Sequence, residues 1–100
     1  PGFDPQELAA RAVYAFTGKP EDITLICERH ILDHVIDKFG ADVRISEKDE
    51  NQLKIELTAS PKGVKFWALQ YLPYVEVRTP LWLREEIIES VNRNKYIMKE

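Results

Sequence analysis

The stretch that decides the fold is DITLICERHILDHVIDKFGADVRI, residues 22–45. The spacing of its apolar residues changes from every second residue to the spacing of a helix, and then back to every second residue. Ile23, Leu25 and Cys27 recur at every second position, which predicts an extended strand. The next apolar residues recur at helical spacing on one face, namely Ile31, Leu32, Val35, Ile36 and Phe39. We therefore expect a helix after the first strand, packed on a sheet through this face.

The residues after this helix predict a turn and two further strands. Gly40 stands where a helix commonly ends in a left-handed residue. Val43 and Ile45 resume the two-residue alternation, and the apolar residues alternate again at 53–57. The polar run at 47–51 lies between the two segments and indicates a turn. We expect these two strands to form a hairpin.

The remaining sequence predicts one helix, one short strand and a last helix. Ser60-Pro61 provides an N-cap followed by proline, and the helix after it has an apolar stripe of Val64, Trp67, Ala68, Tyr71 and Leu72. Val75 and Val77 mark a short strand. Thr79-Pro80 begins the last helix, whose apolar side is Leu83, Ile87, Ile88 and Val91.

The predicted order of elements defines the fold class. The middle six follow the order β-α-β-β-α-β, which is that of the ferredoxin-like α+β fold with an antiparallel four-stranded sheet. A helix on each side, N-terminal and C-terminal, flanks this core. We expect residues 1–20 to form a helical connection from a preceding domain and residues 21–100 to form the ferredoxin-like domain.

Composition limits the functions open to the chain. It has 100 residues, a net charge of −3 and a pI of about 5.4. Surfaces that bind duplex DNA normally carry excess positive charge, so this piece alone is not expected to be the DNA reader. No apolar run approaches the roughly 20 residues that span a bilayer. The single cysteine fits a cytoplasmic setting, and the chain begins at Pro1 without Met, so we expect a piece of a longer protein.

Two kinds of chemical site are suggested by single residues but not by the residues around them. Cys27, His30 and His34 resemble metal ligands, but the histidines lie opposite the apolar stripe and Cys27 should point into the core. Arg29 stands where an acylphosphatase would hold phosphate, yet the turn at residues 28–30 has no glycine and contains a glutamate. We therefore expect no metal, no cofactor and no enzymatic activity.

Recognition of RNA through an open sheet is also not expected. It needs aromatic side chains on the two central strands, on which bases stack. The outward positions of those strands are predicted to be Thr24, Ile26, Lys54 and Glu56, none of them aromatic.

Three large apolar residues fall on the side of their helices away from the core stripes. They are Phe66 and Leu69 in the helix after Pro61 and Trp82 in the last helix. Exposed apolar residues beside basic ones, here Lys62 and Lys65, are typical of a protein interface. The alternative is that the terminal helices of the same chain cover them.

Several short motifs resemble one known family when they are taken in order. These are Val35-Ile36-Asp37-Lys38-Phe39-Gly40 with Asp42-Val43, Ile23-Thr24-Leu25, Trp67 with Tyr71, Pro80 with Leu83-Arg84-Glu85, and Tyr96. Over nearly its whole length the chain resembles the C-terminal extension (WCX) domain of bacterial WYL-domain transcriptional regulators.

The resemblance implies a domain of a dimeric regulator that binds DNA through an N-terminal reader, which would lie upstream of Pro1. It implies packing on the WYL domain of the same or a sister subunit and a part in the response to an effector, either a ligand or nucleic acid. Arg29, Lys62 and Lys65 are then candidates for contacts with an anionic effector. The alternative is an ACT-like module that binds a small molecule, although the first turn lacks the glycines of that family.

Overall fold

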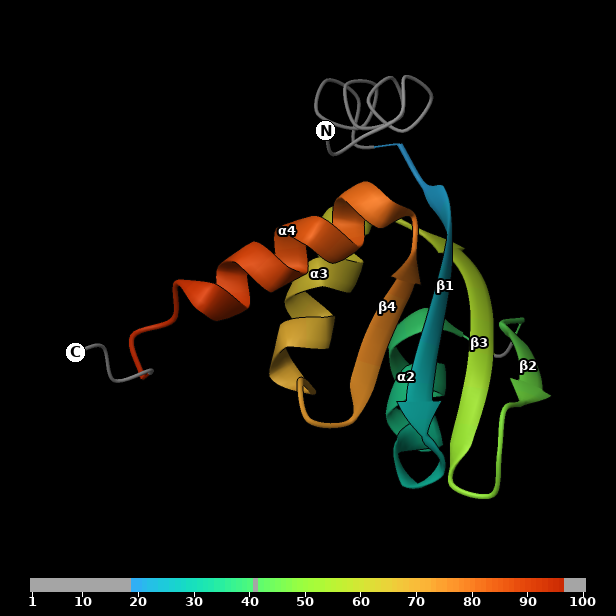
Figure 1. The fold of residues 1–100 in the computed structure, drawn as a ribbon. Helices are drawn as coiled ribbons and strands as arrows, with labels where there is room; N and C mark the ends of the chain where they lie inside the picture. Colours follow the sequence, from blue (N-terminus) through green and yellow to red (C-terminus); the bar gives the residue numbers. More distant parts are fainter. Residues whose placement is uncertain (1–18, 41, 97–100) are drawn as a thin grey trace.

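The computed structural model of the chain describes residues 19–40 and 42–96, shown in Figure 1. The predicted helix of the N-terminal connection lies outside these described residues. The four strands are β1 (Glu21–Glu28), β2 (Arg44–Glu47), β3 (Gln52–Ala59) and β4 (Val75–Thr79). They form one sheet in the order β2-β3-β1-β4, and every neighbouring pair is antiparallel. The predicted α+β class and the four-stranded antiparallel sheet are confirmed.

The helices follow the strands at the positions that the sequence predicts. A short 3-10 turn, η1 (Arg29–Ile31), leads into α2 (Leu32–Phe39), and α3 (Pro61–Gln70) and α4 (Leu81–Asn92) follow later. The C-cap of α2 is Gly40, with φ of 94°, a conformation that glycine adopts without the steric cost a side chain would add. Ser60 is the N-cap of α3, and Pro61 occupies its first turn, as expected.

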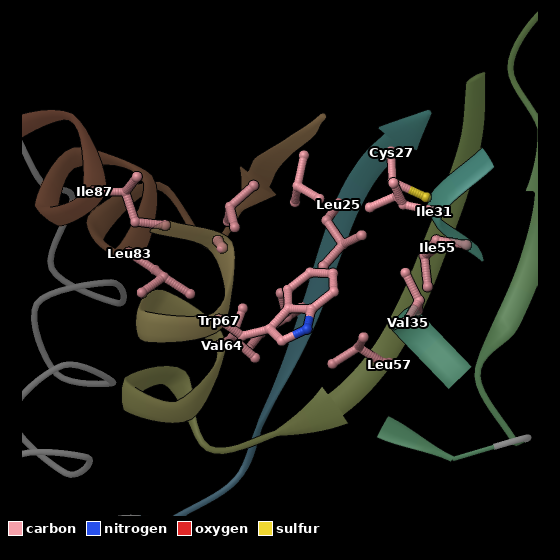
Figure 2. Close-up of a cluster of buried hydrophobic side chains, with 14 of the residues drawn as sticks. Leu25, Cys27, Ile31, Val35, Ile55, Leu57, Val64, Trp67, Leu83 and Ile87 are labelled. Carbon is pink, nitrogen blue, oxygen red and sulfur yellow. The ribbon is translucent and has the colours of Figure 1, made fainter. Parts of the chain in front are cut away.

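The core lies between one face of the sheet and the helices, as Figure 2 shows. The pairing of β1 with β3 sets Ile23, Leu25 and Cys27 opposite the alternating apolar residues of β3, so both strands present them on the same face. Helices α2, α3 and α4 cover this face with the buried side chains Val35, Val64, Trp67, Ala68, Leu83 and Ile87. The alternating apolar residues of the strands and the apolar faces of the helices therefore form one core.

Trp67 of α3 contacts Phe39 of α2 and so joins the two helices that follow β1 and β3. Only 6% of its surface is exposed. Its ring meets that of Phe39 edge-on at 5.1 Å between centroids and that of Tyr71 at 5.0 Å. Both distances lie in the range at which aromatic pairs attract each other beyond the burial of their area.

Strand β2 departs from the prediction. All four of its residues are exposed, and Ile45, expected in the core, is 43% exposed. Ile45 pairs with Ile55, which is fully buried, so the two side chains occupy the same row of the sheet. The difference arises because β2 is a short edge strand, paired on one side only.

We expect Trp67→Ala to lower the free energy of unfolding by about 3–5 kcal/mol, because it empties the space between α2, α3 and the sheet. Phe66→Ala is the matched control: Phe66 is the next residue in the chain but is 54% exposed, and its loss should cost less than about 1 kcal/mol. Urea unfolding followed by circular dichroism measures both values. Equal losses in the two variants would contradict this placement of Trp67.

Candidate interaction site

A shallow hollow lies between the first turns of α3 and α4. We call it the Phe66 hollow; it has a volume of about 170 Å³ and is lined by Pro61, Lys62, Lys65, Phe66, Trp82 and Glu86, among others. Phe66 is the exposed apolar side chain at its edge. This surface contains four of the residues predicted from the sequence as an interface and its basic rim.

The structure corrects two of the three apolar residues predicted for that interface. Trp82 is 1% exposed and belongs to the core, so its predicted exposure is wrong. Leu69 is half-buried and packs against the core. The reason for Trp82 is that α4 buries a broad arc, with Trp82, Leu83 and Ile87 spread over about 140° of the helix at 100° per residue. The stripe predicted from the sequence, Leu83, Ile87, Ile88 and Val91, spans a similar arc on the other side of Leu83 and therefore leaves out Trp82.

Some of the charged side chains around the Phe66 hollow already form ion pairs within the domain. The Lys65 Nζ lies 3.5 Å from an oxygen of Glu86, and both side chains are mostly buried. The same Nζ is 5.9 Å from the centre of the Phe66 ring, within the range of a cation–π attraction. Lys62 is exposed beside them. Of the two lysines, Lys62 is therefore the one placed to meet an anionic group.

Arg29 lies in a different part of the molecule from these lysines. It follows the C-terminal end of β1, whereas Lys62 follows the C-terminal end of β3, and the two strands are antiparallel. The two residues are thus at opposite ends of the sheet (Figure 1). The three predicted contacts for an anionic effector do not form one site.

The guanidinium of Arg29 holds the loop between β2 and β3. It lies 3.1 Å from a carboxylate oxygen of Glu47 and donates hydrogen bonds to the carbonyl oxygens of Glu50 at 3.2 Å and Asp49 at 3.4 Å. The hollow beside it, about 570 Å³, is lined also by Glu28 and by the side of the loop that contains Asp49 and Glu50. Acidic neighbours and an occupied guanidinium do not make the phosphate cradle that an acylphosphatase needs.

Each histidine contacts a tyrosine from the turn between α3 and β4. The Tyr71 hydroxyl lies 3.3 Å from Nδ1 of His34, and His30 meets the Tyr74 ring edge-on at 5.0 Å between centroids. Cys27 is fully buried on the core side. Within residues 19–40 and 42–96, no three His, Cys, Asp or Glu side chains are grouped to hold a metal ion. These tyrosine contacts were not predicted because they join segments 37 and 44 positions apart.

A second surface, which the sequence analysis did not find, is an apolar groove bounded by α3, β4 and α4. We call it the β4 groove; its volume is about 310 Å³ and its apolar lining is Ala68, Leu72, Val75, Val77, Ile87, Ile88 and Val91. Leu72 and Ile88, both predicted to be core residues, are each 41% exposed at its edge. The apolar stripes of α3 and α4 are therefore wider than the core they cover.

An ion pair fixes α4 beside β4 at one end of this groove. Arg84 Nη1 lies 2.6 Å from Oε2 of Glu76 and donates a second hydrogen bond to the Val77 carbonyl at 2.9 Å. Arg78 lies 3.4 Å from the same carboxylate. The Arg84 hydrogen bond, with help from the charge of Arg78, lowers the pKa of Glu76, against the smaller opposing effect of burial.

These features describe a small α+β domain with two apolar surfaces and with several of its charges paired inside the domain. Comparison with protein families matches residues 19–93 to the WCX domain. The match covers about three quarters of the chain, so the chain belongs to the WCX domain family. A search of the curated proteins found no match. Among the described residues, no helix is both long and apolar enough to cross a membrane.

We expect the Glu76–Arg84 pair to make stability depend on pH. Because the pKa of Glu76 is lowered in the folded state, its contribution is complete above 4.5, the ordinary value, and is lost as the pH falls through the folded-state pKa. Glu76→Gln should cost less than about 1 kcal/mol at pH 7, since the carboxylate is 43% exposed, and this difference should disappear in acid. Urea unfolding over a pH series measures it, with Glu85→Gln as the control for charge. A difference that is constant with pH would contradict the assignment.

We also expect zinc to bind the chain more weakly than micromolar. His30 and His34 each contact a tyrosine ring, and neither belongs to a group of three metal-ligating side chains within residues 19–40 and 42–96. Isothermal titration of the chain with zinc chloride measures the affinity, and His34→Ala should leave the titration unchanged. Tighter binding that this substitution removes would establish a metal site on α2.

Proposed function

We propose that the chain is the C-terminal interaction and sensory domain of a WYL-type transcriptional regulator. Its membership of the WCX domain family supports this role. The main structural support is the Phe66 hollow, where the ring of Phe66 is more than half exposed beside the exposed Lys62. We also class the fold as ferredoxin-like, on the basis of the strand order β2-β3-β1-β4.

In this proposal the Phe66 hollow docks on the WYL domain of the same or a sister subunit of a homo-oligomer. The Phe66 ring would supply the apolar contact, and Lys62 would supply a positive charge at its edge. An effector that binds one arrangement of the subunits better than the other would shift the population between the two. The DNA contact would belong to the N-terminal reader of the same cytoplasmic regulator, and the role of this domain is non-catalytic.

An anionic effector would then meet Lys62 at the docked surface, in combination with cations of the WYL domain. Arg29 is left out of this contact because it lies at the other end of the sheet and binds the β2–β3 loop. The ACT-like alternative gains no support at that end, since the turn after β1 is held by the same loop and faces acidic side chains.

We expect Phe66→Asp to weaken the dimer or the effector response of the full-length regulator that contains this chain. A buried carboxylate without a partner is costly at an apolar contact, whereas the side chain is exposed in the domain alone. Analytical ultracentrifugation and effector-dependent DNA binding measure the two effects. Ile45→Asp is the matched control, because Ile45 is an exposed apolar residue on the opposite edge of the sheet.

The circular dichroism and melting temperature of the isolated 100-residue chain should be nearly the same with and without Phe66→Asp. Leu69→Asp is less suitable for this test, because Leu69 packs against the core and its change would also unfold the domain. If the Phe66→Asp regulator assembles and responds as the parent does, the docking surface is elsewhere.

A further inference from the structure

The β4 groove has the size of a small-molecule site. Its inner lining includes buried side chains of α3 and β4, namely Ala68, Val75 and Val77. Leu72 and Ile88 stand exposed at its edge. Its volume of about 310 Å³ is close to the lower end of the range of about 300–1,000 Å³ in which small-molecule sites fall. A stable protein interface instead takes roughly 800 Å² from each partner, which is far more than this groove offers.

The wall contributed by α4 sets the length of such a ligand. Arg84, Ile88 and Val91 follow one another along the groove side of this helix, about one turn apart. At about 1.5 Å per residue, the distance along the helix axis from Arg84 to Val91 is about 10 Å. The polar side chains of the lining lie at the two ends of this path, Glu76 beside Arg84 and Asn92 beyond Val91. The groove therefore fits an apolar body with a polar group at one end.

The guanidinium of Arg84 determines which polar group fits. Within residues 19–40 and 42–96, both of its hydrogen bonds come from Nη1, one to Glu76 and one to the Val77 carbonyl, and Nε and Nη2 make none. The side chain is 35% exposed. The Nε and Nη2 N–H groups lie along one side of the planar guanidinium, where their spacing matches the two oxygens of a carboxylate. This side of Arg84 is therefore able to bind a carboxylate with two parallel hydrogen bonds.

The charges at this end of the groove also favour an anion. Arg84 and Arg78 both contact the carboxylate of Glu76, at 2.6 Å and 3.4 Å. Two guanidinium groups thus share one carboxylate, and one positive charge is left unbalanced. Glu76 and Arg84 are the charged residues of the groove lining itself. A bound monoanion would balance this charge, whereas a cationic head group would increase it.

We propose that the β4 groove binds a small monocarboxylate with an apolar body, such as a medium-chain fatty acid. Its carboxylate meets Nε and Nη2 of Arg84, and its chain lies between Leu72 and Ile88 in the direction of Val91. The residues that line this groove and those that line the Phe66 hollow do not overlap. The site needs only this domain, so it does not rest on the proposed regulatory function.

The first experiment titrates the isotope-labelled 100-residue chain with octanoate and follows the methyl groups of Leu72, Ile88 and Val91 by NMR. We expect saturable shifts of these groups at millimolar octanoate. Octanol, which has the same chain without the charge, should bind at least about tenfold more weakly, because it cannot form the charged hydrogen bonds. Butyrate should also bind at least about tenfold more weakly, because its chain is shorter. Equal affinities for octanoate and octanol, or no shifts in the groove, overturn the proposal.

Substitutions at three exposed apolar residues locate the binding site. Ile88→Asp places a negative charge about one turn from Arg84 and should weaken octanoate binding at least about tenfold. Ile45→Asp is the matched control on the opposite edge of the sheet and should leave the affinity unchanged. Phe66→Asp should also leave it unchanged. If Phe66→Asp is instead the variant that removes binding, octanoate binds in the Phe66 hollow, and the proposal fails.

Arg84→Gln tests the contact with the carboxylate. It should lower the affinity for octanoate about tenfold, toward that of octanol, and leave the affinity for octanol unchanged. Damage to the groove alone would lower both affinities together, and that result, like an unchanged affinity for octanoate, contradicts the assigned contact. Arg84 also joins α4 to β4, so the variant is first checked for folding by circular dichroism. If it does not fold, the comparison of octanoate with octanol on the parent chain decides the same point.

Two other occupants of the groove are distinguished by further measurements. A chain that ends at residue 94 is titrated beside the full chain. Octanoate shifts in the groove of the shorter chain alone would mean that the C-terminal segment of the same chain occupies the groove. Groove shifts that grow with protein concentration, without octanoate, would mean that a second copy occupies it. Either result overturns the proposed ligand site.

Discussion

Strand β1 is hydrogen-bonded along both edges, and the rest of the domain is built around that constraint. Its neighbours β3 and β4 bond it on either side, so its side chains, like those of β3, lie away from the sheet edges. Leu25 and Cys27 are fully buried on the helix face. Even Ile26, on the opposite face between Lys54 and Glu76, is only 6% exposed. A strand buried on both faces reads as a near-continuous apolar run, as residues 25–27 do.

The elements that the sequence predicted well are those whose signals are local. The change of period between β1 and α2, the glycine after α2 and the Ser60-Pro61 start of α3 each depend on residues within one or two turns. The alternating residues of β3 also placed that strand correctly, because its inward face is covered along its whole length. Local chemistry of this kind needs no knowledge of which element packs on which.

The wrong predictions concern side chains whose burial depends on elements that are distant in the sequence. Trp82 is covered because α4 packs against α3, and Ile88 is exposed because the same packing leaves the β4 groove open. Arg29 stays exposed, but its guanidinium contacts the β2–β3 loop, about 20 residues later in the sequence, and this contact was not predicted. A helical wheel contains none of this information, since it describes one helix without its neighbours. The candidate site could therefore be predicted only at Phe66 and its two lysines.

The attachment of α4 has a consequence for how the domain loses its structure. This helix contacts the edge of the sheet through the Arg84 hydrogen bonds and through Trp82, Leu83 and Ile87, with no further strand to hold it. If α4 detaches first, the whole outer edge of β4 and the buried tryptophan become accessible together. An open strand edge beside a large apolar surface is the feature from which intermolecular β-aggregation starts. In this domain the last helix therefore covers the strand edge at which intermolecular β-pairing would begin.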